Sequence, residues 1–450
     1  MEATLLRNMI DHIDSLDPAL YAQDTRLCLL DALGCILYGA TLRDGAAVID
    51  GVYGFGAGNV PLPASDRCFT PDACALVMGA LCHLRELDDV HVSIIHPGAC
   101  VVPAAWSAAF FLDQSLGALT EAIFAGYEAA ARISEASGFL AHRERGWHAT
   151  GTIGPFGAAM AVSRLLRLHA EESVWALGIA GSRTGGTWAF AQDGAMTKRL
   201  HPGMAARDGL QAAFLAKAGI SGPAYVLDAA DGGLFHVMSE GADPSKLTPS
   251  GGLPAVSSVE CKCYASCKSV HSPLEAAAAL YRMRREALRT VLPSAVKVYI
   301  NASAMHMAGR MYDKGSVTSA QLSIPYGVAL ALNGRQGSAA DYSDECIADN
   351  RLYELASLVE MEVSPDMDAL RREASTSSAV VEVLWADGSH SREFVKAAKG
   401  SIERPLSADD KIQKFLSLAA ARIGENGAER LADTILHAAA ETKVRSLFRN

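Results

Sequence analysis

The stretch DTRLCLLDALGCIL, residues 24–37, sets the fold class that we expect for this chain. Its leucines at positions 27, 30, 33 and 37 follow one another at steps of three and four, which places them on one face of a helix. Similar apolar runs follow along the first half of the chain, at 71–84, 102–112, 119–137, 154–168, 170–180 and 204–218. Alanine and leucine dominate these runs, and no convincing strand interrupts them. The sequence therefore predicts a mainly α protein.

The character of the chain changes after a Pro/Gly/Ser-rich stretch at 249–254, which is typical of a linker. AVKVYI (295–300) alternates and is β-branched, as a half-buried strand is. Residues 378–384 alternate as well, and an Asp-Gly pair separates them from a second extended run at 392–395, which predicts a hairpin.

These changes divide the chain into three parts. We expect a large helical domain that begins with residues 1–257, an inserted α+β domain at 258–397, and a helical C-terminal return at 398–450. A cleft between two such domains is a usual place for a small-molecule site.

The bulk composition excludes several classes of protein. The 450 residues are half hydrophobic and carry a net charge of −10, which disfavours nucleic acid and anionic membranes as partners. No apolar run approaches the roughly 18 residues of a membrane helix. The first 17 residues carry acidic side chains rather than the basic start of a signal peptide. With ten scattered cysteines that suit a reduced core, we expect a cytoplasmic protein.

The first polar segment is ELDDVH (86–91), which leads to His96. Carboxylates such as Glu86 and Asp89 lie close in sequence to imidazoles, a combination that serves acid–base chemistry or metal binding. The spacing matches no known metal motif, and a solvated helix end is the alternative interpretation.

The second segment, GWHATGT (146–152), precedes an alanine-rich helix. Free N–H groups at a helix start can hold a carboxylate, with Thr150 beside them. His148 could exchange a proton there near neutral pH. A capped helix start with a half-exposed histidine is the alternative.

The third segment, DGAMTKRLHPG (193–203), is a basic island in an acidic chain. Lys198, Arg199 and His201 suit a di- or tricarboxylate, because charge-assisted hydrogen bonds to carboxylates are strong. A solvated turn is the alternative.

The fourth segment, CKCYASCKSVH (261–271), contains Cys-x-Cys-x₃-Cys and a histidine. Zinc is conceivable, but the usual Cys-x₂-Cys pairs are missing. Lys262, Lys268 and His271 add cationic groups near Cys267. No P-loop, dinucleotide fingerprint or His-Glu-x-x-His motif occurs, so we expect neither a cofactor nor a metal.

The same segments resemble the MmgE/PrpD family, which includes 2-methylcitrate dehydratase, cis-aconitate decarboxylase and iminodisuccinate epimerase. The resemblance covers nearly the whole chain and is most specific in GWHATGTIGPFGAA (146–159) and DGAMTKRLHPGMAARDG (193–209). LLDALGCILYGA (29–40), HPGACVVPAA (96–105) and SIPYGVALAL (323–332) match less closely.

This resemblance implies a helical domain interrupted by an α+β lid, a homodimer, and an active site between the domains. It places His96, His148 and Lys198 on active-site positions, and the residues it marks as neighbours are Asp89, His271 and Tyr326. The sequence departs from the family pattern, since Glu86 replaces an aspartate, Val90 a threonine and Ala265 a proline. Cys267 stands where cis-aconitate decarboxylases have histidine.

We therefore expect a cofactor-independent lyase, foremost a dehydratase of a hydroxy di- or tricarboxylate that abstracts a proton α to a carboxylate. An epimerase and a decarboxylase are the alternatives within the class, and an inactive binding protein is the alternative outside it. Proton transfer is assigned to His148, Lys198, His96 and Asp89. Substrate binding is assigned to Glu86, Thr150, Arg199, His201, Lys262, Cys267, His271 and Tyr326.

Overall fold

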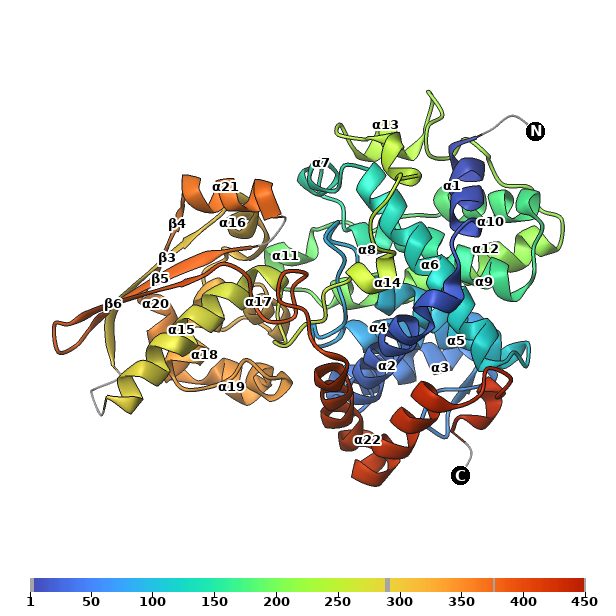
Figure 1. The fold of residues 1–450 in the computed structure, drawn as a ribbon. Helices are drawn as coiled ribbons and strands as arrows, with labels where there is room; N and C mark the ends of the chain where they lie inside the picture. Colours follow the sequence, from blue (N-terminus) through green and yellow to red (C-terminus); the bar gives the residue numbers. More distant parts are fainter. Residues whose placement is uncertain (1–3, 288–291, 375–376, 449–450) are drawn as a thin grey trace.

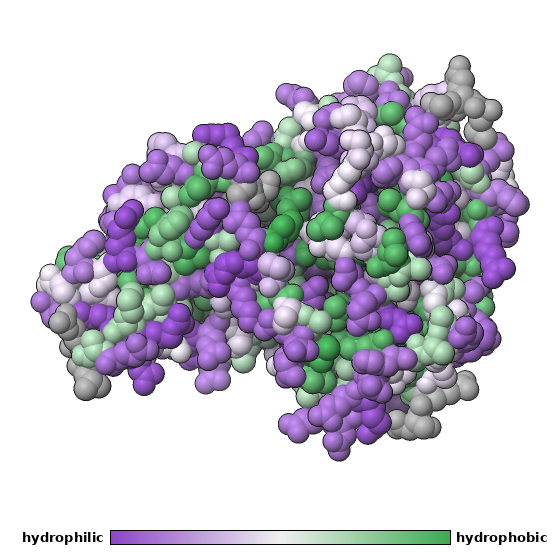
Figure 2. All heavy atoms as spheres, viewed as in Figure 1, coloured by the Kyte–Doolittle hydropathy of each residue, from purple (hydrophilic) through white to green (hydrophobic). Residues whose placement is uncertain are grey.

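The computed structural model describes residues 4–287, 292–374 and 377–448 (Figure 1). It is mainly helical with two small sheets, so the prediction of a mainly α protein is confirmed. Figure 1 shows a helical part on one side and a part that contains the larger sheet on the other, with α11 (Phe190–Asp193) close to their junction. In Figure 2, hydrophobic side chains are visible along this junction among hydrophilic ones.

The first part of the chain is built from helices that differ widely in length. They are α1 (Leu5–Asp14), α2 (Ala22–Gly39), α3 (Arg43–Gly56), α4 (Pro71–His83), α5 (Pro97–Phe111), α6 (Leu116–Ala136), α7 (Phe139–Glu144), α8 (Ala149–Thr152), α9 (Gly154–Leu165), α10 (Ala170–Ser182), α12 (Thr197–Lys217), α13 (Leu234–Met238) and α14 (Ala255–Ser258). Two short antiparallel strands, β1 (Ala57–Pro61) and β2 (Cys68–Phe69), interrupt them. These two strands were not predicted from the sequence, because the pair is short and lacks an alternating pattern.

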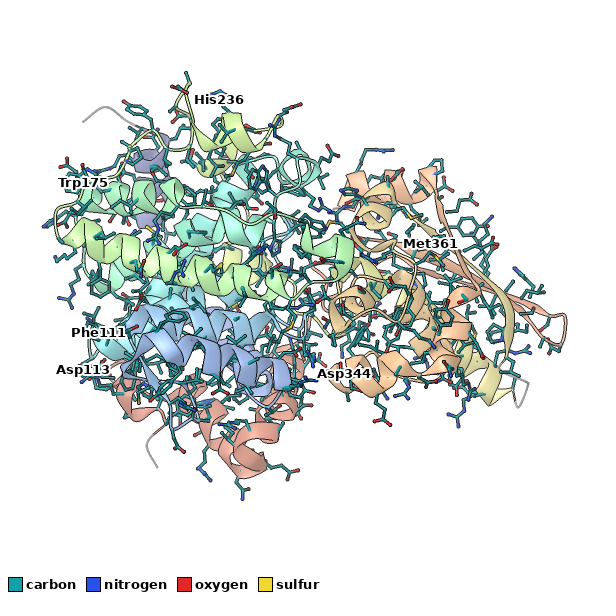
Figure 3. The ribbon with its side chains drawn as sticks, turned by 180° about the vertical axis from the view of Figure 1, so that it is seen from behind. Phe111, Asp113, Trp175, His236, Asp344 and Met361 are labelled. Carbon is teal, nitrogen blue, oxygen red and sulfur yellow. The ribbon has the colours of Figure 1, made fainter. Side chains whose placement is uncertain are left out.

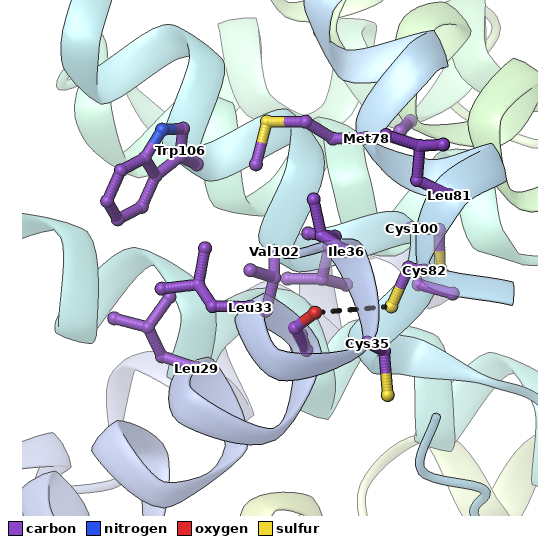
Figure 4. Packing of buried hydrophobic residues seen from close by; sticks show 14 of the residues in the cluster. Leu29, Leu33, Cys35, Ile36, Met78, Leu81, Cys82, Cys100, Val102 and Trp106 are labelled. Atoms are coloured by element: carbon purple, nitrogen blue, oxygen red, sulfur yellow. Dashed lines mark hydrogen bonds between the residues drawn. The ribbon is translucent and has the colours of Figure 1, made fainter. Parts of the chain in front are cut away.

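The core of this part is formed where α2, α4 and α5 meet (Figure 4). Leu33 of α2, Leu81 of α4 and Val102 of α5 are fully buried. Across this contact the thiol of Cys82 donates to the carbonyl oxygen of Ala32, at a sulfur–oxygen distance of 3.7 Å. The leucine stripe in the sequence therefore packs as its spacing predicts.

Two glycines allow α4 and α12 to approach closely. A Cβ atom at Gly79 would lie 2.7 Å from the Cα of Gly203, which is closer than real Cβ contacts allow. This contact lies four residues before His83, the last residue of α4, and five residues after Lys198 in the first turn of α12. The close packing thus brings the end of one helix to the start of the other.

The larger sheet has four strands in the order β4-β3-β5-β6: β3 (Pro293–Ile300), β4 (Val359–Val363), β5 (Ala379–Trp385) and β6 (His390–Val395). β5 and β6 form the hairpin expected from the Asp-Gly pair, and β3 pairs with β5 in antiparallel register. β4, which was not predicted, runs parallel to β3. Met361 of β4 marks this part in Figure 3, far from Phe111 of the helical part.

Helices cover this sheet and connect its strands. They are α15 (Lys268–Glu286), α16 (Ala302–Ala308), α17 (Val317–Gln321), α18 (Ile324–Leu332), α19 (Asp344–Ala348), α20 (Asn350–Ser357) and α21 (Pro365–Ala374). Leu274 and Leu280 of α15 share one buried cluster with Val298 and Val381 of the sheet. The alternating strand residues therefore bury one side against α15.

The chain then returns to the helical part. α22 (Ala408–His437) packs beside α2, as Figure 1 shows, and bends at Gly424, whose φ of +70° is left-handed. Nη1 of Arg26 donates to three carbonyl oxygens near its end, those of Ile435, Leu436 and Ala438.

Among the residues that the structure describes, no single helix is long and apolar enough to cross a membrane. One bent pair, Pro18–Gly39 with Arg43–Gly56, meets the length and composition only when its two helices are joined across an angle of 91°.

Candidate active site

The loop between α4 and α5 carries the acidic residues of the site. It runs from the end of α4 at His83 to His96, directly before α5. Glu86 has a φ of +53°, a left-handed conformation that is uncommon for a residue with a side chain. Backbone strain of this kind is concentrated at functional sites.

The carboxylate of Glu86 is surrounded by cations. It accepts hydrogen bonds from Lys198 and Arg199, and its Oε2 lies 3.0 Å from Nζ of Lys262. Burial would raise the pKa of Glu86, but these cations outweigh burial and hold the pKa well below its usual range. Glu86 is therefore an anion that ties α12 to the segment after α14.

Asp88 connects two imidazoles. Its Oδ2 lies 2.8 Å from Nδ1 of His83 and 3.1 Å from Nδ1 of His96, which is also 2.8 Å from the carbonyl oxygen of Asp89. Because both neighbours of His96 Nδ1 are acceptors, that nitrogen carries a proton. Burial lowers the pKa of His96, so the ring is neutral and its Nε2 is unprotonated. Burial lowers the pKa of His83 to about 3, so this ring is neutral, and its Nε2 accepts from Lys198 at 3.0 Å.

Lys198 is buried with unusual neighbours for a lysine. Its ammonium group contacts Glu86 and His83, and only 3% of its side chain is exposed. Burial, together with Arg199 and Lys262, lowers the pKa of Lys198 to about 8, although Glu86 opposes the shift. A lysine with such a pKa can give up a proton near neutral pH.

His148 lies near the same group of residues. Its Nδ1 is 2.9 Å from Nδ1 of His201, and its ring contacts that of Trp188 with centroids 5.4 Å apart. Burial, and secondarily Lys198, lowers the pKa of His148 well below its usual value, so the ring is neutral. The His83 and His148 ring centroids are 6.1 Å apart, which places His148 near the Lys198 cluster.

These residues share one cavity at the junction of the two parts of the chain. Of the predicted site residues, it is lined by Glu86, His96, His148, Lys198, Lys262 and Cys267. The cavity thus brings together four sequence segments that lie far apart in the chain.

Three other predicted residues lie directly behind this lining. Arg199 contacts Glu86 and Gln321, Oγ1 of Thr150 accepts from the backbone N–H of His96, and His201 contacts His148. They orient lining groups rather than facing the cavity.

The structure does not bring Asp89, His271 and Tyr326 to the cavity. Oδ2 of Asp89 accepts from the Tyr127 hydroxyl at 2.7 Å, beneath the start of α5. The ring of His271 packs edge-on against Tyr264, and the hydroxyl of Tyr326 donates to the Asp341 carbonyl oxygen. Asp89 and Tyr326 therefore have hydrogen-bond partners away from the cavity, whereas Nδ1 of His271 is buried without a hydrogen-bond partner among the described residues.

Other residues at the cavity were not predicted from the sequence as site residues. Trp188, Lys268 and Arg371 line the cavity, and His83 and Asp88 lie directly behind it. His83 ends an apolar helix, so its sequence context suggests core. Its closeness in the chain to the carboxylates of Glu86 and Asp88 was the available signal.

One group among the described residues could hold a metal ion by distance alone. His83, Asp88 and His96 each offer a ligand atom, and these atoms lie within 4.8 Å of one another. However, both Nδ1 atoms already contact Asp88, and Lys198 and Lys262 place positive charge nearby. The donor set therefore suits a hydrogen-bonded triad better than a cation, and the absence of a metal stays a prediction.

Two protein-family models match the chain. The MmgE/PrpD N-terminal domain matches residues 11–247, and the MmgE/PrpD C-terminal domain matches residues 264–439. The chain belongs to the MmgE/PrpD family. The resemblance seen in the sequence motifs is thereby confirmed.

Similar proteins in this family include cis-aconitate decarboxylases. The chain is 26% identical to that of Aspergillus terreus (strain NIH 2624 / FGSC A1156), covering 93% of this chain and 89% of the relative. It is 27% identical to the human cis-aconitate decarboxylase, covering 91% and 85%, and 25% identical to that of Mus musculus, covering 80% and 74%. These relatives support an enzyme of the lyase type.

Proposed function

We propose that this MmgE/PrpD member is a cofactor-independent dehydratase of a hydroxy di- or tricarboxylate. The observation that carries the proposal is that Lys198, with a pKa lowered to about 8, and the neutral imidazole of His148 line one buried cavity beside Lys262. A proton donor, a proton acceptor and a carboxylate-binding cation are the groups that elimination of water needs.

The first step would be removal of the proton α to a carboxylate. In the proposal, the neutral ring of His148 takes this proton, and the negative charge spreads into the substrate carboxylate. Lys262, which is 1% exposed, would stabilise that charge, because electrostatic interactions are strong where water is excluded.

The second step would be departure of the hydroxyl group. The ammonium of Lys198 would give its proton to the leaving oxygen, so that water leaves and the carbon–carbon double bond forms. A lowered pKa makes an ammonium group a better acid. His96, whose Nδ1 is held by Asp88, would accept a hydrogen bond from the substrate hydroxyl at Nε2.

Decarboxylation is the second candidate, because the curated relatives are named cis-aconitate decarboxylases. In that reaction Lys198 would protonate the carbanion left when carbon dioxide departs. Cys267 weakens this candidate. It lines the cavity at a position where, by the family resemblance, cis-aconitate decarboxylases have histidine. Dehydration is therefore the proposal that we favour.

The test is incubation of the chain with citrate, methylcitrate, cis-aconitate and tartrate in D₂O, followed by NMR. Dehydration predicts deuterium at the α carbon together with an unsaturated product from a hydroxy acid. Release of carbon dioxide from cis-aconitate would favour the second candidate. If none of the four carboxylates showed deuterium exchange or turnover, both candidate functions would be contradicted.

We also propose that the enzyme is a homodimer, as the family resemblance implies. X-ray scattering at micromolar concentrations should give twice the mass of the 450-residue chain, and a monomer throughout would reject this.

A further inference from the structure

His83 contacts the site from behind the cavity rather than from its wall. It is the last residue of α4 and is fully buried. Its Nε2 lies 3.0 Å from Nζ of Lys198, and its Nδ1 lies 2.8 Å from Oδ2 of Asp88. Its ring also packs edge-on against that of His96, with centroids 4.6 Å apart. His83 therefore supports two residues that line the cavity, Lys198 and His96.

The carboxylate of Asp88 determines which nitrogen of His83 carries the proton. Burial would raise the pKa of Asp88, but its contacts with His83 and His96 outweigh burial and hold the pKa well below its usual range. An ionised carboxylate can only accept hydrogen bonds, so Nδ1 of His83 is the donor. Because the ring of His83 is neutral, its Nε2 has no proton and is an acceptor. Asp88 thus presents the unprotonated nitrogen of His83 to Lys198.

The ammonium group of Lys198 has three N–H donors. One donates to the carboxylate of Glu86, and a second donates to Nε2 of His83. Among the described residues, no third acceptor contacts this ammonium group, and Lys198 lines the cavity. The third N–H is therefore left for a group inside the cavity.

A neutral acceptor differs from a second carboxylate in this position. Two fixed contacts restrain rotation about the Cε–Nζ bond of Lys198, so the direction of the third N–H is set before a ligand arrives. A carboxylate in place of His83 would set this direction as well, but it would stabilise the charged ammonium and weaken it as an acid. The neutral imidazole orients the donor without that cost in acidity.

We propose that His83 is a positioning residue, which holds the ammonium group of Lys198 so that its third N–H points at the leaving hydroxyl of the substrate. The inference rests on the proposed function, in which Lys198 protonates that hydroxyl. His83 does not line the cavity, so it acts on the reaction through Lys198. A histidine that only ties α4 to the loop of Asp88 is the alternative that the experiment must exclude.

Two substitutions of His83 separate these roles. His83→Leu removes both ring nitrogens, whereas the side-chain amide in His83→Gln can donate to Asp88 and accept from Lys198. The substrate is whichever of citrate, methylcitrate and tartrate the chain dehydrates. His83→Leu should lower kcat about 10–100-fold with KM nearly unchanged, because a poorly aligned acid slows the chemical step. His83→Gln should recover most of this loss.

The pH dependence of kcat/KM supplies a readout that a structural role would not move. A hydrogen bond to the charged form of an amine raises its pKa, so loss of Nε2 should lower the pKa of Lys198. The alkaline limb should therefore move to lower pH by about one unit in His83→Leu and stay in place in His83→Gln. His142→Leu is the matched control, since it removes another fully buried histidine that contacts Thr152 rather than Lys198. This control should leave the limb in place.

Circular dichroism would establish that the variants are folded. Unchanged kcat in a folded His83→Leu variant would overturn the inference, as would a limb that moves equally in His83→Leu and His142→Leu. If His83→Leu does not fold, His83→Gln still decides, because a loss of kcat of about 10-fold or more in that folded variant would overturn the inference. Failure of the proposed function is distinguishable, because the unaltered chain itself would then dehydrate none of the three hydroxy acids.

Discussion

Nδ1 of His148 lies 2.9 Å from Nδ1 of His201, so one of the two rings must donate a proton to the other. Both rings are neutral near pH 7, because burial lowers the pKa of His201 to about 4 and holds that of His148 well below its usual value. If His148 donates, its Nε2 is free of a proton and can act as a base. His201 therefore determines which tautomer of His148 meets the substrate.

The first prediction concerns this pair. His201→Phe should lower kcat about 10–100-fold with little change in KM, because His148 remains in place but its tautomer is no longer selected. His201→Asn, whose side-chain amide can accept from Nδ1, should recover part of the loss. Steady-state kinetics on the substrate found by the panel would measure this, and unchanged kcat in His201→Phe would reject the role.

The second prediction concerns Lys198 and His148 themselves. Lys198→Ala should raise the activation free energy that corresponds to kcat/KM by about 3–5 kcal/mol. His148→Ala should lower kcat/KM by about 10²–10⁴-fold. The double variant should be little worse than the more damaged single variant, because both groups serve one elimination. Circular dichroism would establish folding, and full activity in either folded variant would contradict the assignment.

The third prediction concerns the alkaline limb of the pH profile. If Lys198 acts as the acid, kcat/KM should fall above its pKa of about 8, where the ammonium loses its proton. Glu86 raises that pKa, so Glu86→Gln should move the limb to lower pH. Lys262 lowers it, so Lys262→Gln should move the limb to higher pH.

Opposite displacements in these two variants are the decisive outcome, because a general loss of structure would not separate them by sign. Both variants will also alter KM, since both residues line the cavity. A limb that stays in place in both variants would show that another group titrates there.

The sequence predicted most of the site because chemistry is concentrated in short segments of an apolar chain. Glu86, Lys198 and Lys262 are polar residues in otherwise buried surroundings, and each segment that carries them contributes to the cavity. His83 was not predicted as a site residue, because a histidine buried in the core can also lie at the end of an apolar helix. Its hydrogen bond with Lys198 depends on tertiary packing, in which the Gly79–Gly203 contact brings α4 against α12.

The secondary structure, too, could be predicted from the sequence only where it depends on local residues. The hairpin of β5 and β6 could be predicted, because its turn and alternation are local. β4 could not, since VEMEV (359–363) is a strand through its parallel pairing with the distant β3. Tyr326 was expected near the site from a motif, but its hydroxyl is satisfied by the backbone of Asp341. A motif identifies a segment, and the direction of each side chain within it depends on packing.

The last prediction concerns a buried ion pair behind the site. Nζ of Lys414, from α22, lies 2.7 Å from Oδ1 of Asp31 and donates to the carbonyl oxygen of Leu87 at 2.5 Å. Burial would lower the pKa of Lys414, but Asp31 outweighs it and raises the pKa well above its usual value. Leu87 lies between Glu86 and Asp88, so this pair also supports the acidic loop.

Lys414→Met should therefore lower the free energy of unfolding by about 3–5 kcal/mol, because the Asp31 carboxylate would remain buried without a counter-charge. Asp31→Asn combined with Lys414→Met should cost less than Lys414→Met alone, since the double variant leaves no unpaired charge. Lys399→Met, which removes one partner of the exposed pair with Asp410, is the control and should change stability by about 0–1 kcal/mol. Urea unfolding measures all three variants. If Lys414→Met were as stable as the control, the ion pair would contribute nothing to the fold, and another contact would have to hold the acidic loop beneath the cavity.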